Sequence, residues 1–123
     1  MLFRSHCYVA ETHDAAIEGA KPRVERYIEV FVEAVSSWTG HESGQYAGYG
    51  KMVDSIARTT IESMIEGNQA LIGTPDEVVE QLRFQIATFG EIEPSMQVNF
   101  GGGTEQEALR TLDLFAARVM PKL

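Results

Sequence analysis

The chain has 123 residues, of which 44% are hydrophobic and 23% are charged, and this composition is typical of one ordinary globular domain. Its formal net charge of −8 argues against nucleic acid and anionic membrane surfaces as partners, because both attract basic patches. No apolar run approaches the roughly 20 residues that span a bilayer, and the first residues lack the apolar segment of a signal peptide. The single cysteine fits a reducing compartment, so we expect a cytoplasmic protein.

The first third of the chain predicts a strand followed by a long, interrupted helix. Residues 2–10 are rich in aromatic and β-branched residues, which indicates a strand. Thr12 is a suitable N-cap for the following helix, and Pro22 is expected to break or kink that helix just before it. The helix then resumes, because an amphipathic stripe of apolar residues runs from Val24 to Val35.

The middle of the chain predicts a loop and then another helix. Residues 39–50 include four glycines, which argues against regular structure. Three aromatic residues near this loop either cover a substrate or attach the loop to the core: Trp38, Tyr46 and Tyr49. Residues 52–66 return to helical spacing.

The clearest helix boundary lies at the end of an apolar run, residues 70–72. Gly73 breaks this run, and the hydroxyl of Thr74 can cap a helix whose first turn contains proline. Glu77, three residues after the threonine, can complete a capping box. The spacing predicts a helix that ends at Gly90.

The last part of the chain predicts a second strand and a final helix. Residues 94–100 alternate between apolar and polar side chains, as in a half-buried strand. Three glycines form a turn, and Thr104 with Glu107 makes a second capping box for a helix that Pro121 ends. The pattern therefore predicts a mostly helical α/β domain with two main β-strands.

The residues most often used in catalysis show no recognisable site pattern. His6, His13 and His41 have no partner at metal-ligand spacing, so we predict no metal site and a structural or solvent-facing role for each. Cys7 lies on a strand, where a small core residue is expected rather than a nucleophile. Three glutamates at helical spacing are expected to form a solvated helix face: Glu25, Glu29 and Glu33.

Five segments, taken in order, resemble the luciferase-like flavin-dependent monooxygenases (the bacterial luciferase family). They are Tyr8-Val-Ala-Glu-Thr12, Tyr46-Ala-Gly-Tyr49, Ile72-Gly-Thr-Pro-Asp-Glu-Val-Val79, Met96-Gln-Val-Asn-Phe-Gly-Gly102 and Arg110-Thr-Leu-Asp-Leu-Phe-Ala116. Each motif is short, but the ordered set covers nearly the whole chain. That family has the TIM (β/α)8 barrel fold, which needs about 250 residues.

The resemblance implies that this chain is a C-terminal fragment of such a barrel. The single domain, residues 1–123, would be equivalent to the last two βα units, with strand seven at residues 2–10 and strand eight at residues 94–100. A helical insertion would occupy about residues 11–70. The family uses reduced flavin and dioxygen to oxidise a small organic substrate such as an aldehyde. No catalytic residue is carried over, because no catalytic motif matches, and the chain is expected to be inactive alone.

The resemblance also indicates where a cofactor would bind. The catalytic face of a TIM barrel lies at the carboxyl ends of its strands. Asn99, Gly101 and Gly102 lie at that end of the second strand, where backbone N–H groups before a helix can bind anions. We therefore expect these residues to contact FMN or reduced flavin. The alternative is a simple turn in a chain that binds no cofactor.

Two functions remain open on the sequence. The chain is either a segment of a flavin-dependent monooxygenase or a non-catalytic, oligomerising or small-molecule-binding module derived from that family. Both predict exposed strand edges, which favour pairing with another chain. We expect a homodimer joined through strands or through the stripe from Val24 to Val35, or a complex with a complementary barrel-forming chain.

Overall fold

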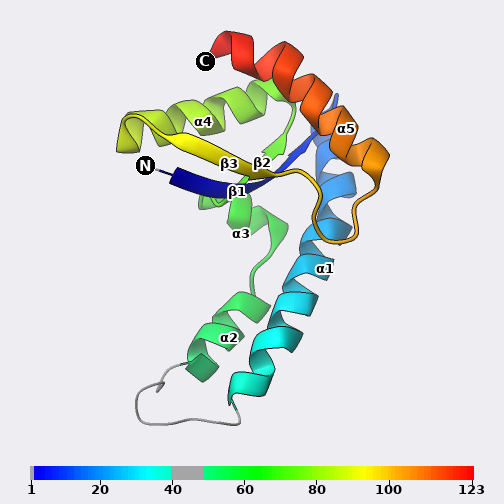
Figure 1. Cartoon of the computed structure of the whole chain (residues 1–123), viewed down its shortest axis with the longest axis vertical. Coiled ribbons are helices and arrows are strands. Elements are labelled where there is room, and N and C mark those ends of the chain that lie inside the picture. Colours follow the sequence, from blue (N-terminus) through cyan, green and yellow to red (C-terminus); the bar gives the residue numbers. More distant parts are fainter. Residues whose placement is uncertain (1, 40–48) are drawn as a thin grey trace.

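The computed structural model describes the backbone of residues 2–39 and 49–123, and the side chains of residues 2–36 and 51–123. The described residues form a three-stranded parallel sheet in the order β2-β1-β3 (Figure 1). Its strands are β1 (Leu2–Val9), β2 (Ala70–Gly73) and β3 (Glu93–Gln97). In the register of the sheet, His6 lies opposite Ala70 on one side and Gln97 on the other.

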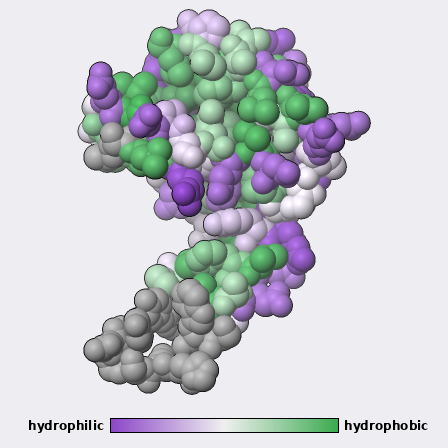
Figure 2. Space-filling model, viewed as in Figure 1, coloured by the Kyte–Doolittle hydropathy of each residue, from purple (hydrophilic) through white to green (hydrophobic). Residues whose placement is uncertain are grey.

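Helices connect and follow the strands. They are α1 (His13–Thr39), α2 (Tyr49–Ala57), α3 (Ile61–Glu66), α4 (Pro75–Phe89) and α5 (Glu105–Leu114), followed by the π-helical turn η1 (Phe115–Val119) and the 3-10 turn η2 (Met120–Lys122). The second half of α1 and α2 extend away from the sheet as an arm (Figure 1). On this arm, hydrophobic residues cover the visible side of α2, whereas α1 is mainly hydrophilic (Figure 2).

The predicted break of the first helix at Pro22 is wrong, because α1 continues through this residue. Pro22 is exposed, whereas Ala16, Ala20 and Val24 are buried on both sides of it along the helix. The burial of this continuous face stabilises the helix and compensates for the hydrogen bond that proline cannot donate.

Each face of the sheet has its own hydrophobic core, because successive strand residues point to opposite sides. On one face, Cys7, Val9 and Leu71 pack against residues of α4, α5 and η1, including Leu82 and Phe115. The opposite face packs against α1 and α3 through Tyr8, Ala20, Val24, Ile61, Met64, Ala70, Ile72 and Phe100. The domain is therefore a small three-layer α/β structure.

The prediction of a TIM-barrel fragment with two main strands is wrong. Consecutive strands of that barrel are neighbours, and its helices lie only on the outside. Here β1 is central between β2 and β3, and helices cover both faces of an open sheet. The third strand is β2, whose four residues are all buried. It is too short and too uniformly apolar to show the alternation by which strands are recognised.

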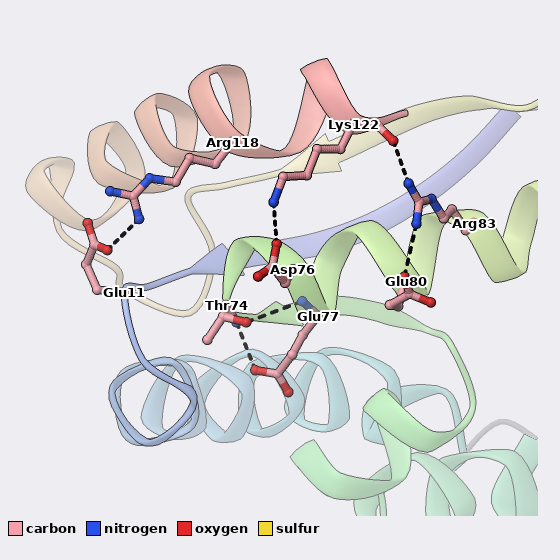
Figure 3. Close-up of polar contacts among 8 residues, drawn as sticks. All are labelled: Glu11, Thr74, Asp76, Glu77, Glu80, Arg83, Arg118 and Lys122. Atoms are coloured by element: carbon pink, nitrogen blue, oxygen red, sulfur yellow. Dashed lines mark hydrogen bonds and ion pairs between the residues drawn. The ribbon is translucent and has the colours of Figure 1, made fainter.

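The predicted capping boxes are confirmed. Figure 3 shows the first, in which Glu77 Oε1 accepts from Thr74 N at 3.0 Å and Glu77 N donates to Thr74 Oγ1 at 3.3 Å. Thr104 and Glu107 form the same pair at the start of α5. A further box, between Thr60 and Ser63, begins α3 and has serine in the position of the usual acidic residue.

Exposed polar contacts accompany the packing of the C-terminal segment onto α4 and β1 (Figure 3). Lys122 Nζ is 2.5 Å from Asp76 Oδ1, and Arg83 Nη2 donates to the Lys122 carbonyl at 2.9 Å. Arg118 pairs with Glu11 at 2.7 Å. Exposed pairs of this kind contribute little to stability. The burial of the neighbouring Val119 is therefore the larger contribution.

We predict that Thr111→Val destabilises the domain by about 1–3 kcal/mol, because it leaves the buried Val9 N–H without an acceptor. Thr111 is fully buried, and its Oγ1 accepts from Val9 N at 3.1 Å. Urea unfolding measures the change. Thr88→Val on the exposed side of α4 is the matched control, and its effect should stay within about 0.5 kcal/mol. Equal effects of the two substitutions would contradict the role of this bond.

Candidate functional site

The topology of the sheet marks the carboxyl ends of β1 and β3 as the place where a ligand is expected. The two strands are neighbours, but β1 leads into α1 on one face and β3 leads into α5 on the other. Such connections diverge and leave a crevice outside the strand ends, and open α/β sheets bind ligands there. The candidate site is therefore built from the end of β1, the turn after β3, and the facing parts of α1 and α5.

Four side chains from three elements meet beyond these strand ends, and we call them the Glu107 cluster: Tyr8, Arg23, Glu107 and Arg110. The Tyr8 hydroxyl donates to Glu107 Oε2 at 2.5 Å and accepts from Arg110 Nη2 at 2.8 Å. Arg23 Nη2 donates to Glu107 Oε1 at 2.5 Å. The guanidinium of Arg110 also lies 5.3 Å from the centre of the Tyr8 ring. Both carboxylate oxygens of Glu107 are therefore engaged.

Local structure holds each member of the cluster in place. Glu107 is the third residue of α5 and also accepts from Thr104 N at 3.1 Å through its capping box. Tyr8 is central in the sheet, and its hydroxyl passes close to Gly19 of α1, where an added Cβ would lie 2.2 Å from the oxygen. A side chain at position 19 would displace the tyrosine. Because Gly19 has no side chain, the Tyr8 hydroxyl can pass α1 and reach Glu107 of α5.

The charges of the cluster are fixed near neutral pH. Burial by itself would raise the pKa of Glu107, but hydrogen bonds from Arg23, Tyr8 and Thr104 outweigh burial and bring it to about 2. The pKa of Tyr8 is raised by burial and by its hydrogen bond to Glu107. The cluster thus contains one carboxylate, which pairs with Arg23, and a second guanidinium, Arg110, which contacts Tyr8, so its four side chains carry a positive excess. Glu107 is too weak a base to accept protons at neutral pH, and this arrangement favours holding an anion over proton transfer.

The predicted cofactor residues lie beside this cluster, in the turn that joins β3 to α5. Gly101 has a φ of +58° and packs against the α1 backbone, where an added Cβ would lie 1.8 Å from the Arg23 carbonyl oxygen. Its small size is therefore required by packing. Gly102 has a φ of +73°, is exposed and has open space around it, as an anion-binding backbone group needs. Asn99 is exposed on the same turn. Their binding of a cofactor stays a prediction.

Sequence reasoning missed the Glu107 cluster itself. It identified Glu107 only as a capping residue, and Tyr8 and Arg110 only as parts of resembling segments. Their separations in the chain, 99 residues for Tyr8 and Glu107 and 84 for Arg23 and Glu107, exclude any signal from local spacing. The available hint was the polar tip of a tyrosine within an apolar strand, because a buried hydroxyl needs a partner.

The other candidate residues lie apart from this site. His13 Nδ1 is 2.8 Å from Glu77 Oε2 in an exposed pair. Cys7 is confirmed as a core residue, and burial raises the pKa of its thiol to about 12. The glutamates of α1 are exposed as predicted. Among the described residues, no group of three or more His, Cys, Asp or Glu could hold a metal ion.

Several predictions fall on residues whose side chains the structure does not describe. The aromatic lid and the loop histidine belong here: Trp38, Tyr46, Tyr49 and His41. For the helices within the described residues, none is both long and apolar enough to cross a membrane.

The chain is similar in structure to a monooxygenase. No protein-family model and no curated protein matches it. The crystal structure of the monooxygenase RslO1 from Streptomyces bottropensis aligns with 98% of this chain, with a TM-score of 0.72 and 27% sequence identity. The chain spans only 30% of the length of that protein. The similarity associates the fold with an oxidoreductase.

The identification of the chain as a luciferase-like protein is corrected by these findings. The resemblance rested on short motifs and on their order along the chain. No family model supports it, and the open sheet with β1 at its centre is not part of the barrel that the resemblance implied. Helix-start motifs such as Gly73-Thr74-Pro75 occur wherever a strand leads into a helix, so they specify local structure rather than a family.

We predict that Glu107→Gln removes up to about 3 kcal/mol of stability at pH 7, because the difference between an ordinary glutamate pKa of 4.5 and about 2 corresponds to that energy. The pKa is lower in the folded state, so the contribution is complete above pH 4.5 and is lost as the pH falls toward 2. Chemical unfolding at several pH values measures it. Glu105→Gln, also in the first turn of α5 and exposed, is the control. A difference between wild type and Glu107→Gln that stays constant from pH 7 to pH 3 would contradict the ion-pair role.

Proposed function

We propose that this chain is the flavin-phosphate-binding part of a monooxygenase that uses reduced flavin and dioxygen on a small organic substrate. The observation that carries the proposal is the similarity of almost the whole chain to a monooxygenase. The chain corresponds to less than a third of that protein, so we expect it to bind cofactor and to be inactive alone.

The chemistry of the Glu107 cluster fits the phosphate of FMN. Arg23 is oriented by Glu107, and its Nε is buried without a hydrogen-bond partner among the described residues. The exposed backbone of Gly102 and the amide of Asn99 lie on the turn beside it. A guanidinium, an amide and a backbone N–H before a helix are suitable donors for a phosphate dianion. The bound flavin would supply the electrons that reduce dioxygen.

No residue of this chain is assigned to acid–base catalysis. Glu107 has a pKa of about 2 and serves to hold Arg23 in position. Tyr8 fixes the other oxygen of the same carboxylate, so its role is also positioning. The remaining catalytic groups and the substrate pocket would come from other parts of a larger assembly.

We predict that FMN binds the chain and that Arg23→Gln weakens binding by tenfold or more, because a charge-assisted hydrogen bond contributes about 1.5–3 kcal/mol. Fluorescence anisotropy of FMN measures the affinity. Riboflavin lacks the phosphate, so the affinity of the wild-type chain for riboflavin should be no higher than the affinity of Arg23→Gln for FMN. Arg26→Gln is the matched control: the residue lies on the same helix in an exposed pair with Glu29. Its affinity for FMN should be unchanged.

Two results would contradict the flavin proposal. One is the absence of FMN binding at millimolar concentration by protein that is folded by circular dichroism. The other is equal loss of affinity in Arg23→Gln and Arg26→Gln, which would indicate attraction by overall charge. Circular dichroism of both variants is needed because Arg23→Gln also removes a partner of Glu107.

A second candidate is a non-catalytic module that assembles with itself or with a complementary chain. The observation in its favour is that β2 and β3 are the outer strands, with no further strand on either side among the described residues. On α1, Tyr27 and Phe31 of the predicted stripe are exposed, whereas Val24 and Val35 are buried. A dimer by light scattering, together with no FMN binding, would favour this candidate.

A further inference from the structure

A hollow of about 380 Å³ lies at the amino ends of β1 and β2, opposite the end that carries the Glu107 cluster. It lies where the start of β1 meets the last turns of α4, which are neighbours in Figure 1. Aromatic rings and a polar floor line it, and the residues that matter are Phe3, Ser5, Asn68, Phe84, Gln85 and Phe89. Its volume is within the range of small-molecule sites.

The walls of the hollow are aromatic and accessible. The rings of Phe3 and Phe89 are 4.8 Å apart at 48°. Phe84 and Phe89 of α4 are 54% and 47% exposed. Single exposed apolar residues are ordinary, but three phenylalanines around one hollow provide a surface on which a planar ring can pack.

The floor of the hollow contains a hydrogen-bond acceptor that has no partner. Gln85 is only 2% exposed, and its Nε2 donates to the Asn68 carbonyl at 3.3 Å. This contact to a carbonyl fixes which end of the amide is the nitrogen. The oxygen, Oε1, is buried and has no hydrogen-bond partner within the described part of the chain. An unpaired buried acceptor is costly, so a donor that reached it would be bound favourably.

We propose that this hollow binds a small planar aromatic molecule that carries one N–H or O–H donor. The ring packs against the phenylalanine side chains, and the donor bonds to Gln85 Oε1. The proposed bond requires a small rotation about the terminal torsion of Gln85, which is soft for an amide, because Oε1 is buried and Nε2 has to keep its bond to the Asn68 carbonyl. A ring of the same shape without a donor should bind more weakly, because it leaves Gln85 Oε1 unpaired.

The test uses two probes of nearly equal shape, indole and benzothiophene, of which only indole has an N–H donor. Titration followed by NMR chemical shifts of the full chain gives both dissociation constants. We expect indole to bind about tenfold more tightly than benzothiophene, and we expect the shifts to concentrate on residues around the hollow. Equal affinities, or no binding of indole, would overturn the proposal.

The chain offers a closely matched control for the acceptor. Gln81 lies one turn earlier on α4, and its Nε2 donates to the Ile72 carbonyl at 3.0 Å. Its Oε1 also lacks a partner among the described residues, but Gln81 does not line the hollow. Gln85→Met should reduce the tenfold preference for indole to about one, whereas Gln81→Met should keep it. Equal loss in both variants would show that the preference arises elsewhere.

Thr88→Trp provides a second variant that leaves the core intact, because Thr88 lines the hollow from an exposed position on α4. The added ring should fill the hollow and abolish indole binding without changing the circular dichroism spectrum. Retained indole affinity in this variant would overturn the site. A dimer of the wild-type chain that Thr88→Trp dissociates would show that a second copy occupies the hollow, and would also overturn it.

Discussion

The central position of β1 is the constraint on which the rest of the structure depends. Residues 6–9 of this strand pair with β2 and residues 2–6 pair with β3, and a hydrophobic core lies on each face of the resulting sheet. Cys7 and Val9 point into one core and Tyr8 into the other. A one-residue slip of β1 would exchange these sets and place a tyrosine hydroxyl in the core beneath α4. The register of the sheet and the position of the Glu107 cluster are therefore determined together.

The Glu107 cluster shows how structural ion pairs can prepare a binding site. Its carboxylate connects a strand to two helices through Tyr8, Arg23 and the capping box of α5. The same contacts make it a poor base and leave an excess of guanidinium charge beside an exposed glycine turn. A chain with a net charge of −8 has little tendency to attract anions over its whole surface, so a local positive site determines where an anion can bind.

The two ends of the sheet differ in chemistry. The carboxyl ends carry fixed charges and a glycine turn, whereas the amino ends carry aromatic rings and the Gln85 amide oxygen, which has no partner in the described part of the chain. Charged donors suit a phosphate, and rings with a single acceptor suit a small aromatic molecule. The two features lie at opposite strand ends of a sheet that has three strands in the described part of the chain.

The sequence by itself determined the local structure. Thr74 with Glu77 and Thr104 with Glu107 specify two helix starts, because a capping box uses residues only three positions apart. Helical spacing likewise identified α4 and α5, and the position of Cys7 on a predicted strand placed it in the core. These features depend on neighbours in the chain, so they can be read from the order of residues.

Only the tertiary structure decided the strand order, the identity of β2 as a strand and the meeting of Tyr8, Arg23 and Glu107. Strand order depends on which edges pair, and the same local pattern is compatible with β1 or β2 at the centre. The motifs that resembled a barrel enzyme describe strand ends and helix starts, which an open sheet shares with a closed one. In the cluster, Arg23 lies 84 positions and Tyr8 lies 99 positions from Glu107 along the chain. Contacts between residues so far apart arise only when the strands and helices pack.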